Sequence, residues 1–205
     1  MLSAVRLAMF DAAASLRSAH DVLGEFLAGP TNIASVNALV HDVAAAMSRG
    51  NKVLACGNGG SMCDAAHFCE ELTGRFRKDR KPLPALACND AGHLSCVAND
   101  YGYEHVFSRW VQAFGSAGDV LIVLSTSGNS ANCIRAASSA KQQGVRTWGL
   151  LGKAGGELRS ACDASIVVPG ATADRIQELH MLILHTVVEG VEVELGLDGG
   201  SDGGK

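Results

Sequence analysis

DVLIVLSTSGNS, residues 119–130, joins a run of continuous apolar residues to a loop of Ser, Thr, Gly and Asn. A strand that is apolar at every position, instead of at alternate positions, is typical of a parallel sheet buried on both faces. A helix is predicted after the loop, over residues 130–142. Because a strand followed by a helix is the repeating unit of α/β proteins, this stretch predicts a parallel sheet covered by helices.

The same unit recurs along the chain. Four more apolar strands are predicted, one within 50–61 and the others over 84–88, 145–152 and 164–170. Further helices are predicted over 2–28, 33–49, 61–73, 103–114 and 172–195. The pattern predicts an α/β fold, a three-layer αβα sandwich around a five-stranded parallel sheet, with two N-terminal helices added to it.

The predicted domain organisation has three parts. Residues 1–50 form an N-terminal helical layer, 51–195 form the α/β domain, and the Gly- and Asp-rich residues 196–205 form a flexible tail. The apolar stripes of the two leading helices and the nearly all-apolar last helix offer more apolar surface than one such domain buries. A homo-oligomer is therefore expected, with the helical layer packing in it.

Composition excludes several classes of protein. The net charge is −4 and no dense basic run is present, which argues against nucleic acid as a partner. The seven cysteines form no C-x-x-C pair, and their odd number favours reduced thiols in a cytoplasmic protein. Arg6, Asp11 and Arg17 interrupt the apolar N-terminus, so neither a signal peptide nor a membrane span is expected.

Two loops that follow predicted strands lie where open α/β sheets bind ligands. The first, Gly57–Ser61, matches neither a P-loop nor a complete dinucleotide-binding fingerprint, so it is either a tight turn that needs positive φ or a ligand-binding turn. The second, Ser125–Ser130, brings four hydroxyl groups to a helix start, where backbone N–H groups lack partners. Capping needs only one hydroxyl, so this loop is predicted to bind phosphate.

Two helices carry polar residues that could share one site. His67 and Glu71 are one turn apart on one helical face, a pair that alone is more often a surface hydrogen bond than a site. Gln177 and His185 lie on the apolar last helix and need polar partners, because burying either unpaired costs about 1–3 kcal/mol. The four residues together could bind Zn²⁺, although Gln is an uncommon ligand.

Four segments carry a resemblance to a known family: CGNGGSMCDAAHFCEELTGR (56–75), ANDYGYEHVFSR (98–109), GDVLIVLSTSGNSANCIRA (118–136) and ADRIQELHMLILH (173–185). Over nearly its whole length the chain resembles the phosphoheptose isomerases, a sugar isomerase (SIS) domain family. The resemblance implies a flavodoxin-like SIS domain and a homotetramer with its sites near subunit interfaces. It also implies an enzyme that isomerises sedoheptulose 7-phosphate to D-glycero-D-manno-heptose 7-phosphate through an enediol, the first step of activated heptose biosynthesis.

The resemblance further implies roles for individual residues. Glu71 and His185 would be the catalytic acid–base pair. One zinc ion per subunit would be bound by His67, Glu71, Gln177 and His185. The phosphate would be held by Ser125, Thr126, Ser127 and Ser130. Other contacts to the substrate would come from Asn58, Gly59, Gly60, Ser61, Glu71, Asn99, Asp100, Asp174 and Gln177.

Two alternatives stay open at this point. A Glu bound to Zn²⁺ is a poorer base, so Glu71 either leaves the metal during turnover or transfers the proton in a metal-free site. The alternative to an enzyme is a non-catalytic tetramer of the same fold that binds a bacterial replication initiator. The presence of both Glu71 and His185 favours the enzyme.

Overall fold

The computed structural model describes residues 10–197 of the 205-residue chain. The helices are α1 (Ala12–Ala28), α2 (Asn32–Ser48), α3 (Gly60–Thr73), α4 (Ala91–Tyr101), the 3₁₀ helix η1 (Tyr103–His105), α5 (Val106–Phe114), α6 (Ala131–Gln142), α7 (Leu158–Ala161) and α8 (Ala173–Glu194). The strands are β1 (Val53–Gly57), β2 (Ala85–Ala87), β3 (Val120–Ser125), β4 (Arg146–Gly152) and β5 (Ala164–Val168). Within residues 10–197, none of the helices has both the length and the apolarity that crossing a bilayer requires.

The five strands form one sheet in which every neighbouring pair is parallel. Their order is β2-β1-β3-β4-β5, which confirms the predicted five-stranded parallel sheet. β3 is central and buried along its whole length, as its continuous apolar sequence predicts. The strand order reverses between β1 and β3, so a crevice for ligands is expected at the carboxyl ends of these two strands.

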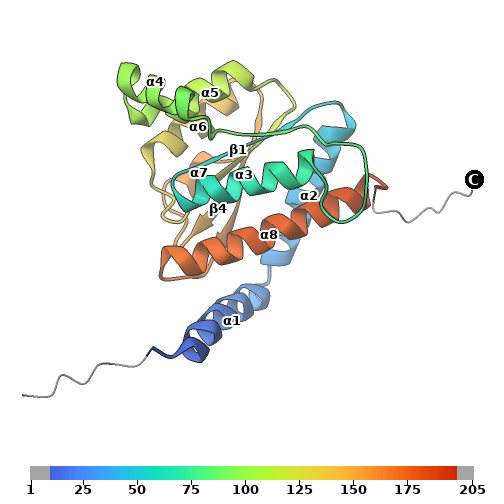
Figure 1. The fold of residues 1–205 in the computed structure, drawn as a ribbon, viewed down its shortest axis with the longest axis vertical. Helices are drawn as coiled ribbons and strands as arrows, with labels where there is room; N and C mark the ends of the chain where they lie inside the picture. The colour runs from blue at the N-terminus through green and yellow to red at the C-terminus, as the bar shows by residue number, and fades with distance from the viewer. Residues whose placement is uncertain (1–9, 198–205) are drawn as a thin grey trace, which may run out of the picture.

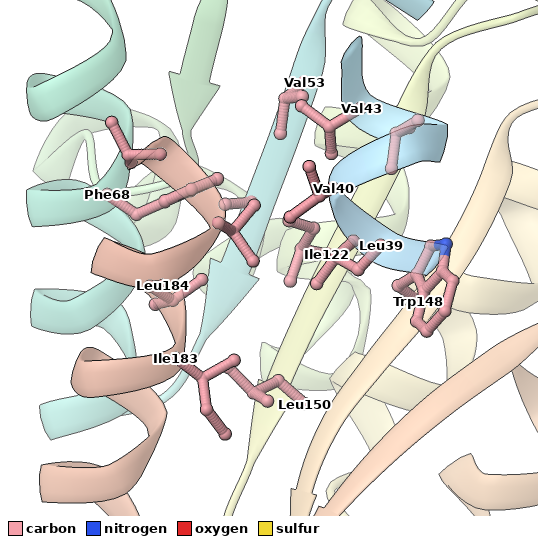
Figure 2. Close-up of a cluster of buried hydrophobic side chains, with 14 of the residues drawn as sticks. Leu39, Val40, Val43, Val53, Phe68, Ile122, Trp148, Leu150, Ile183 and Leu184 are labelled. Carbon is pink, nitrogen blue, oxygen red and sulfur yellow. The ribbon is translucent and has the colours of Figure 1, made fainter. Parts of the chain in front are cut away.

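Helices cover both faces of the sheet, which confirms the predicted three-layer sandwich. On one face, Phe68 of α3 and Leu184 of α8 share a buried cluster with Ile122 of β3 (Figure 2). On the other face, Phe107 of α5 and its neighbours from α4, α6 and α7 pack against Leu121. Successive residues of β3 therefore point to opposite faces of the sheet, and both faces are shielded from solvent.

The two leading helices pack differently from each other. Leu39 of α2 lies in the core beside the sheet (Figure 2), and Nε1 of Trp148 in β4 donates a hydrogen bond to Asp42 of α2 at 2.8 Å. The predicted boundary at residue 50 therefore does not divide the hydrophobic core. α1 lies at the periphery (Figure 1), where of its residues only Phe26 is buried and Leu16 is 72% exposed.

Some predicted elements differ from the observed ones. α1 begins at Ala12, after its N-cap Asp11, so the prediction is wrong at residues 10–11, and its part over 2–9 lies outside the described residues. Helices α4 and α7 are absent from the prediction. α4 buries only Val97, so its apolar period is too weak to indicate a helix. The predicted tail over 196–205 lies outside the described residues, apart from residues 196–197.

Candidate active site

The turn after β1 is shaped by two glycines. Gly59 has a φ of +56°, a left-handed value that favours glycine, and it is the N-cap of α3. A Cβ on Gly60 would lie 2.6 Å from Nε2 of Gln177, so glycine at this position lets α8 approach the first turn of α3. The segment is thus a tight turn, one of its two predicted interpretations, and it also brings α8 to the crevice.

A small pocket lies between this turn and the loop after β3. The pocket has a volume of about 60 Å³. It lies at the carboxyl ends of β1 and β3 and beside the first turns of α3 and α8. Its lining residues are Asn58, Ser61, Leu124, Ser125, Thr126, Ser127, Ser130 and Gln177. Among these described residues no Lys or Arg is present. An anion in this pocket would therefore be held by hydroxyl groups and backbone N–H groups at the start of α6.

The hydroxyl groups of the loop differ in the hydrogen bonds that they make within the protein. Oγ of Ser125 accepts a hydrogen bond from the N–H of Gly128 at 3.1 Å, and Oγ of Ser127 accepts one from the N–H of Asn129 at 3.2 Å. Both hydroxyls keep their own proton for donation to a ligand. Ser130 is the N-cap residue of α6, yet its side chain makes no capping hydrogen bond. Capping therefore does not explain why this loop is rich in hydroxyls.

The loop after β4 packs directly against the Ser125–Ser130 loop. Gly128 has a φ of +70°, and a Cβ there would clash with the carbonyl oxygen of Gly155. Oδ1 of Asn129 accepts a hydrogen bond from the N–H of Glu157 at 3.0 Å. The close approach of the two backbones requires glycine at 128 and fixes the shape of the hydroxyl-rich loop.

The side chain of Asn58 is occupied within the protein. Its amide exchanges two hydrogen bonds with the amide of Asn132, at 2.9 and 2.8 Å, and its Oδ1 accepts a third from the hydroxyl of Tyr103 at 3.1 Å. Asn132 is buried at the start of α6. Asn58 therefore ties the two loops together. No pattern in the sequence indicates a role for Asn132 or Tyr103, although both lie inside the motifs that carry the resemblance.

Three polar side chains meet where α3 faces α8. Oε1 of Glu71 lies 3.2 Å from Nε2 of His67 and 4.0 Å from Nε2 of His185. The two imidazole rings are 5.1 Å apart, edge to face. Glu71 is the least exposed of the three, and one ligand atom from each residue lies within 4.8 Å of the others. This His–Glu–His cluster can transfer protons or bind a metal ion.

Gln177, the fourth predicted zinc ligand, lies apart from this cluster. Its Nε2 is 3.4 Å from Oγ of Ser61, at the pocket. Gln177 precedes His185 by eight residues, which is about 12 Å along a helix axis. Its amide would have to turn away from Ser61 to reach a metal ion at the His–Glu–His cluster.

Three predicted substrate residues lie neither in the pocket, nor in the turn after β1, nor in the His–Glu–His cluster. Asn99 and Asp100 are exposed on α4, where Nδ2 of Asn99 donates a hydrogen bond to Asp100 at 2.8 Å. Asp174 is exposed in the first turn of α8. A hydrogen bond from Thr172, followed by the nearby backbone and Arg175, holds the pKa of Asp174 below its usual value. Within this chain, these three residues are not brought to the candidate site.

Asp64, on α3, is a further acidic residue beside the candidate site. It lies three residues after Ser61 and three before His67, between the pocket and the His–Glu–His cluster. Its Oδ2 is buried and makes no hydrogen bond to the described residues. Burial raises the pKa of Asp64 to about 6, and nearby His67 lowers it only in part. No pattern in the sequence indicates this burial.

Comparison with known proteins agrees with the geometry. A sequence model of the SIS domain family matches residues 17–152. The phosphoheptose isomerase of Fusobacterium nucleatum is 50% identical over 87% of this chain and 92% of its own, and that of Vibrio cholerae is 50% identical over 88% and 95%. The structure of a phosphoheptose isomerase from Neisseria gonorrhoeae superposes with a TM-score of 0.82 at 36% identity, covering 88% of this chain and 96% of that one.

The parallel sheet, the crevice between β1 and β3 and the family match define the class: the chain belongs to the SIS domain family. Within this family it groups with the phosphoheptose isomerases, and it is an enzyme of the isomerase class.

Proposed function

We propose that this enzyme converts sedoheptulose 7-phosphate to D-glycero-D-manno-heptose 7-phosphate, the first step of activated heptose biosynthesis. One observation carries the proposal: the carboxylate of Glu71 lies between His67 and His185, on the two helices that border the hydroxyl-lined pocket. The name phosphoheptose isomerase, borne by relatives of about 50% identity, supports this choice of substrate.

The pocket takes the phosphate end of the substrate. Hydroxyl protons of Ser125–Ser130 and the N-terminus of α6 bind the dianion. Ser61 and His67 are six residues apart, about 9 Å along α3, a span that a seven-carbon sugar phosphate can cover. The binding energy of the phosphate then orients the far end of the sugar beside the His–Glu–His cluster.

The proton transfer uses Glu71 and His185. Glu71 takes a proton from C1 of the ketose while His185 donates one to the oxygen on C2, which gives an enediol. Glu71 then returns its proton to C2, and His185 accepts the proton of the C1 oxygen, which gives the aldose. Both residues end in their starting protonation states, so the cycle closes.

Zinc, one ion per subunit, fits the donors of this cluster. Two imidazole nitrogens and one carboxylate oxygen are the kind of three-ligand set that catalytic zinc sites use, and Gln177 would be the fourth ligand if it turned from Ser61. When bound, the ion would polarise the substrate carbonyl. A carboxylate that holds the ion is a poorer base, so Glu71 would serve either as a ligand or as the base, and not as both at once.

The proposal includes a cytoplasmic homotetramer with its sites near subunit interfaces. Apolar side chains of α1 and α8 that are exposed in the single chain support an oligomer in which the N-terminal helical layer packs, among them Leu16, Leu27 and Leu182. The seven free cysteines are expected in a reducing compartment.

The decisive experiment replaces Glu71. Purified Glu71→Gln is incubated with sedoheptulose 7-phosphate and aldose formation is followed. We expect turnover to fall at least about 100-fold, because the amide cannot accept the proton. Glu70→Gln, one residue earlier on the exposed face of α3, is the matched control and should keep its activity. Unchanged turnover of Glu71→Gln would refute the assigned base.

Metal removal tests the role of zinc separately. Enzyme treated with a chelator should lose most of its turnover, and added Zn²⁺ should restore it, because the ion stabilises the developing negative charge on oxygen. Metal-free enzyme that keeps full turnover would contradict the zinc proposal and leave the acid–base proposal in place.

The site does not favour the alternative function, which is binding of a replication initiator. A non-catalytic tetramer has no need for an acid–base pair, whereas here Glu71 and His185 face each other from α3 and α8.

A further inference from the structure

Arg80, in the segment between α3 and β2, is a charged side chain in the protein interior. Its side chain is 2% exposed, and its Nε donates a hydrogen bond to Oε1 of Glu192 at 2.7 Å. Glu192, on α8, is itself only 6% exposed. Taking both charges out of water is costly, so a buried pair of this kind is weak evidence for a purely stabilising role.

The other N–H groups of Arg80 bind the C-terminal end of α3. Nη2 donates to the carbonyl oxygen of Glu71 at 2.7 Å, and Nη1 donates to the carbonyl oxygens of Leu72 at 2.8 Å and Gly74 at 3.2 Å. The last carbonyl groups of a helix lack intrahelical partners, and the negative end of the helix dipole favours a cation there. Arg80 therefore holds the peptide group of Glu71 itself.

The partner of Arg80 lies on the helix that carries His185. Glu192 follows His185 by seven residues, close to two full turns, so both lie on the same side of α8. One guanidinium group thus connects the main chain of Glu71 to the helix of His185.

We propose that Arg80, paired with Glu192, is a positioning residue for the acid–base pair: it sets the separation between Glu71 and His185 across α3 and α8. This inference rests on the proposed function of that site. The planar fork of five N–H donors can bind a carboxylate and several carbonyls at once, which a lysine ammonium on a flexible stem does less well.

The same two segments contain a second ion pair that serves as a control. Arg77 and Glu189 approach to 2.7 Å, but their side chains are 60% and 48% exposed, and no hydrogen bond joins Arg77 to a carbonyl of α3 among the described residues. Arg77→Lys therefore makes the same chemical change, three residues away, without touching the end of α3.

The experiment compares Arg80→Lys, Glu192→Gln and Arg77→Lys with the wild-type enzyme. For the first two we expect kcat for sedoheptulose 7-phosphate to fall by about 10- to 100-fold, the range found when partners that orient catalytic ligands are removed. KM should change little, because the phosphate is bound at the other end of α3. Cobalt(II) titration of the metal-free proteins should show affinity weakened by a similar factor, about 10- to 100-fold. Arg77→Lys should match the wild type in both measurements.

Two outcomes would overturn the inference. The first is wild-type kcat and cobalt affinity in Arg80→Lys and Glu192→Gln. The second is a loss of kcat that matches the fraction of unfolded protein, which would mean a structural role only. If Arg80→Lys does not fold, Glu192→Gln carries the test, because it leaves the bonds to α3 in place.

Failure of the proposed function would look different. A wild-type enzyme that neither turns over sedoheptulose 7-phosphate nor binds cobalt would refute the function but not the positioning. Crystal structures of the wild type and Arg80→Lys would then decide: an unchanged separation of Glu71 and His185, 4.0 Å here, would overturn the inference.

Discussion

Burial gives two histidines of α8 different chemistry at the scale of single residues. His185 is partly exposed and lies beside Glu71. His180, five residues earlier, is completely buried, and neither of its ring nitrogens makes a hydrogen bond to the described residues. Burial lowers the pKa of His180 from 6.5 to about 4, and the nearby backbone of Leu151 raises it only in part. His180 is therefore neutral and structural in the folded protein.

His180 should make stability fall in mild acid. Its pKa is 6.5 when unfolded and about 4 when folded, so the unfolded chain binds the proton first as the pH drops between these values. This group's contribution is full above pH 6.5 and declines by up to about 3 kcal/mol towards pH 4. His180→Met removes the proton-binding group and costs little at pH 7, because no hydrogen bond is lost.

Urea unfolding at pH 7 and pH 4.5 checks this expectation. The wild type should lose more stability between the two values than His180→Met does. An equal loss in both proteins would show that His180 does not titrate in this window.

At the scale of elements, the two parts of the proposed site come from different elements. The loop after β3 and the N-terminus of α6 form the pocket, and α3 and α8 carry the His–Glu–His cluster. The two helices run in the same direction, since Ser61 meets Gln177 at their beginnings and Glu71 meets His185 further along. One helix pair can therefore contact both ends of an extended substrate.

The shape of the loop after β3 should depend on Gly128. In Gly128→Ala, the new Cβ would combine a φ of +70° with a clash against the Gly155 carbonyl. We expect a loss of about 1–3 kcal/mol of stability. KM for the sugar phosphate should rise about tenfold or more, as for the loss of one hydrogen bond to a charged group. Steady-state kinetics and thermal unfolding measure the two effects.

Gly24→Ala is the matched control for that substitution. Gly24 lies within α1, and a Cβ added there would meet nothing within 4 Å, so alanine should leave KM unchanged and favour the helix. Wild-type KM in Gly128→Ala would show that the loop does not bind the phosphate.

At the scale of the whole molecule, apolar surface remains on α1 and α8. Leu16 is 72% and Leu182 is 47% exposed in the single chain, although α1 packs against α8. Exposed apolar patches of this kind mark surfaces that another protein covers. The proposed tetramer would bury them and place α1 between subunits.

Leu16→Glu should weaken the oligomer. The added charge would have to be buried in the interface, whereas in a free chain it would remain in water. Light scattering should show a smaller particle than the wild type, and circular dichroism should show the same helix content. Ser18→Glu, also exposed on α1, tests the effect of charge alone. A wild-type protein that is monomeric would contradict the tetramer outright.

Local patterns in the sequence were enough to establish the sheet, its five strands and most of the helices, because apolar periodicity reports local structure and burial. The sequence also indicated both loops and, through the resemblance, all three members of the His–Glu–His cluster. α4 escaped prediction because a helix that buries one residue has no clear period.

Which polar groups meet became evident only in the folded chain. Gln177 contacts Ser61 instead of His185, Asn58 is paired with Asn132, and Arg80 joins the end of α3 to α8. Each contact joins residues far apart in the chain, and it depends on how closely two helices or loops approach. That distance is set by packing across the whole core, which no local pattern of residues contains.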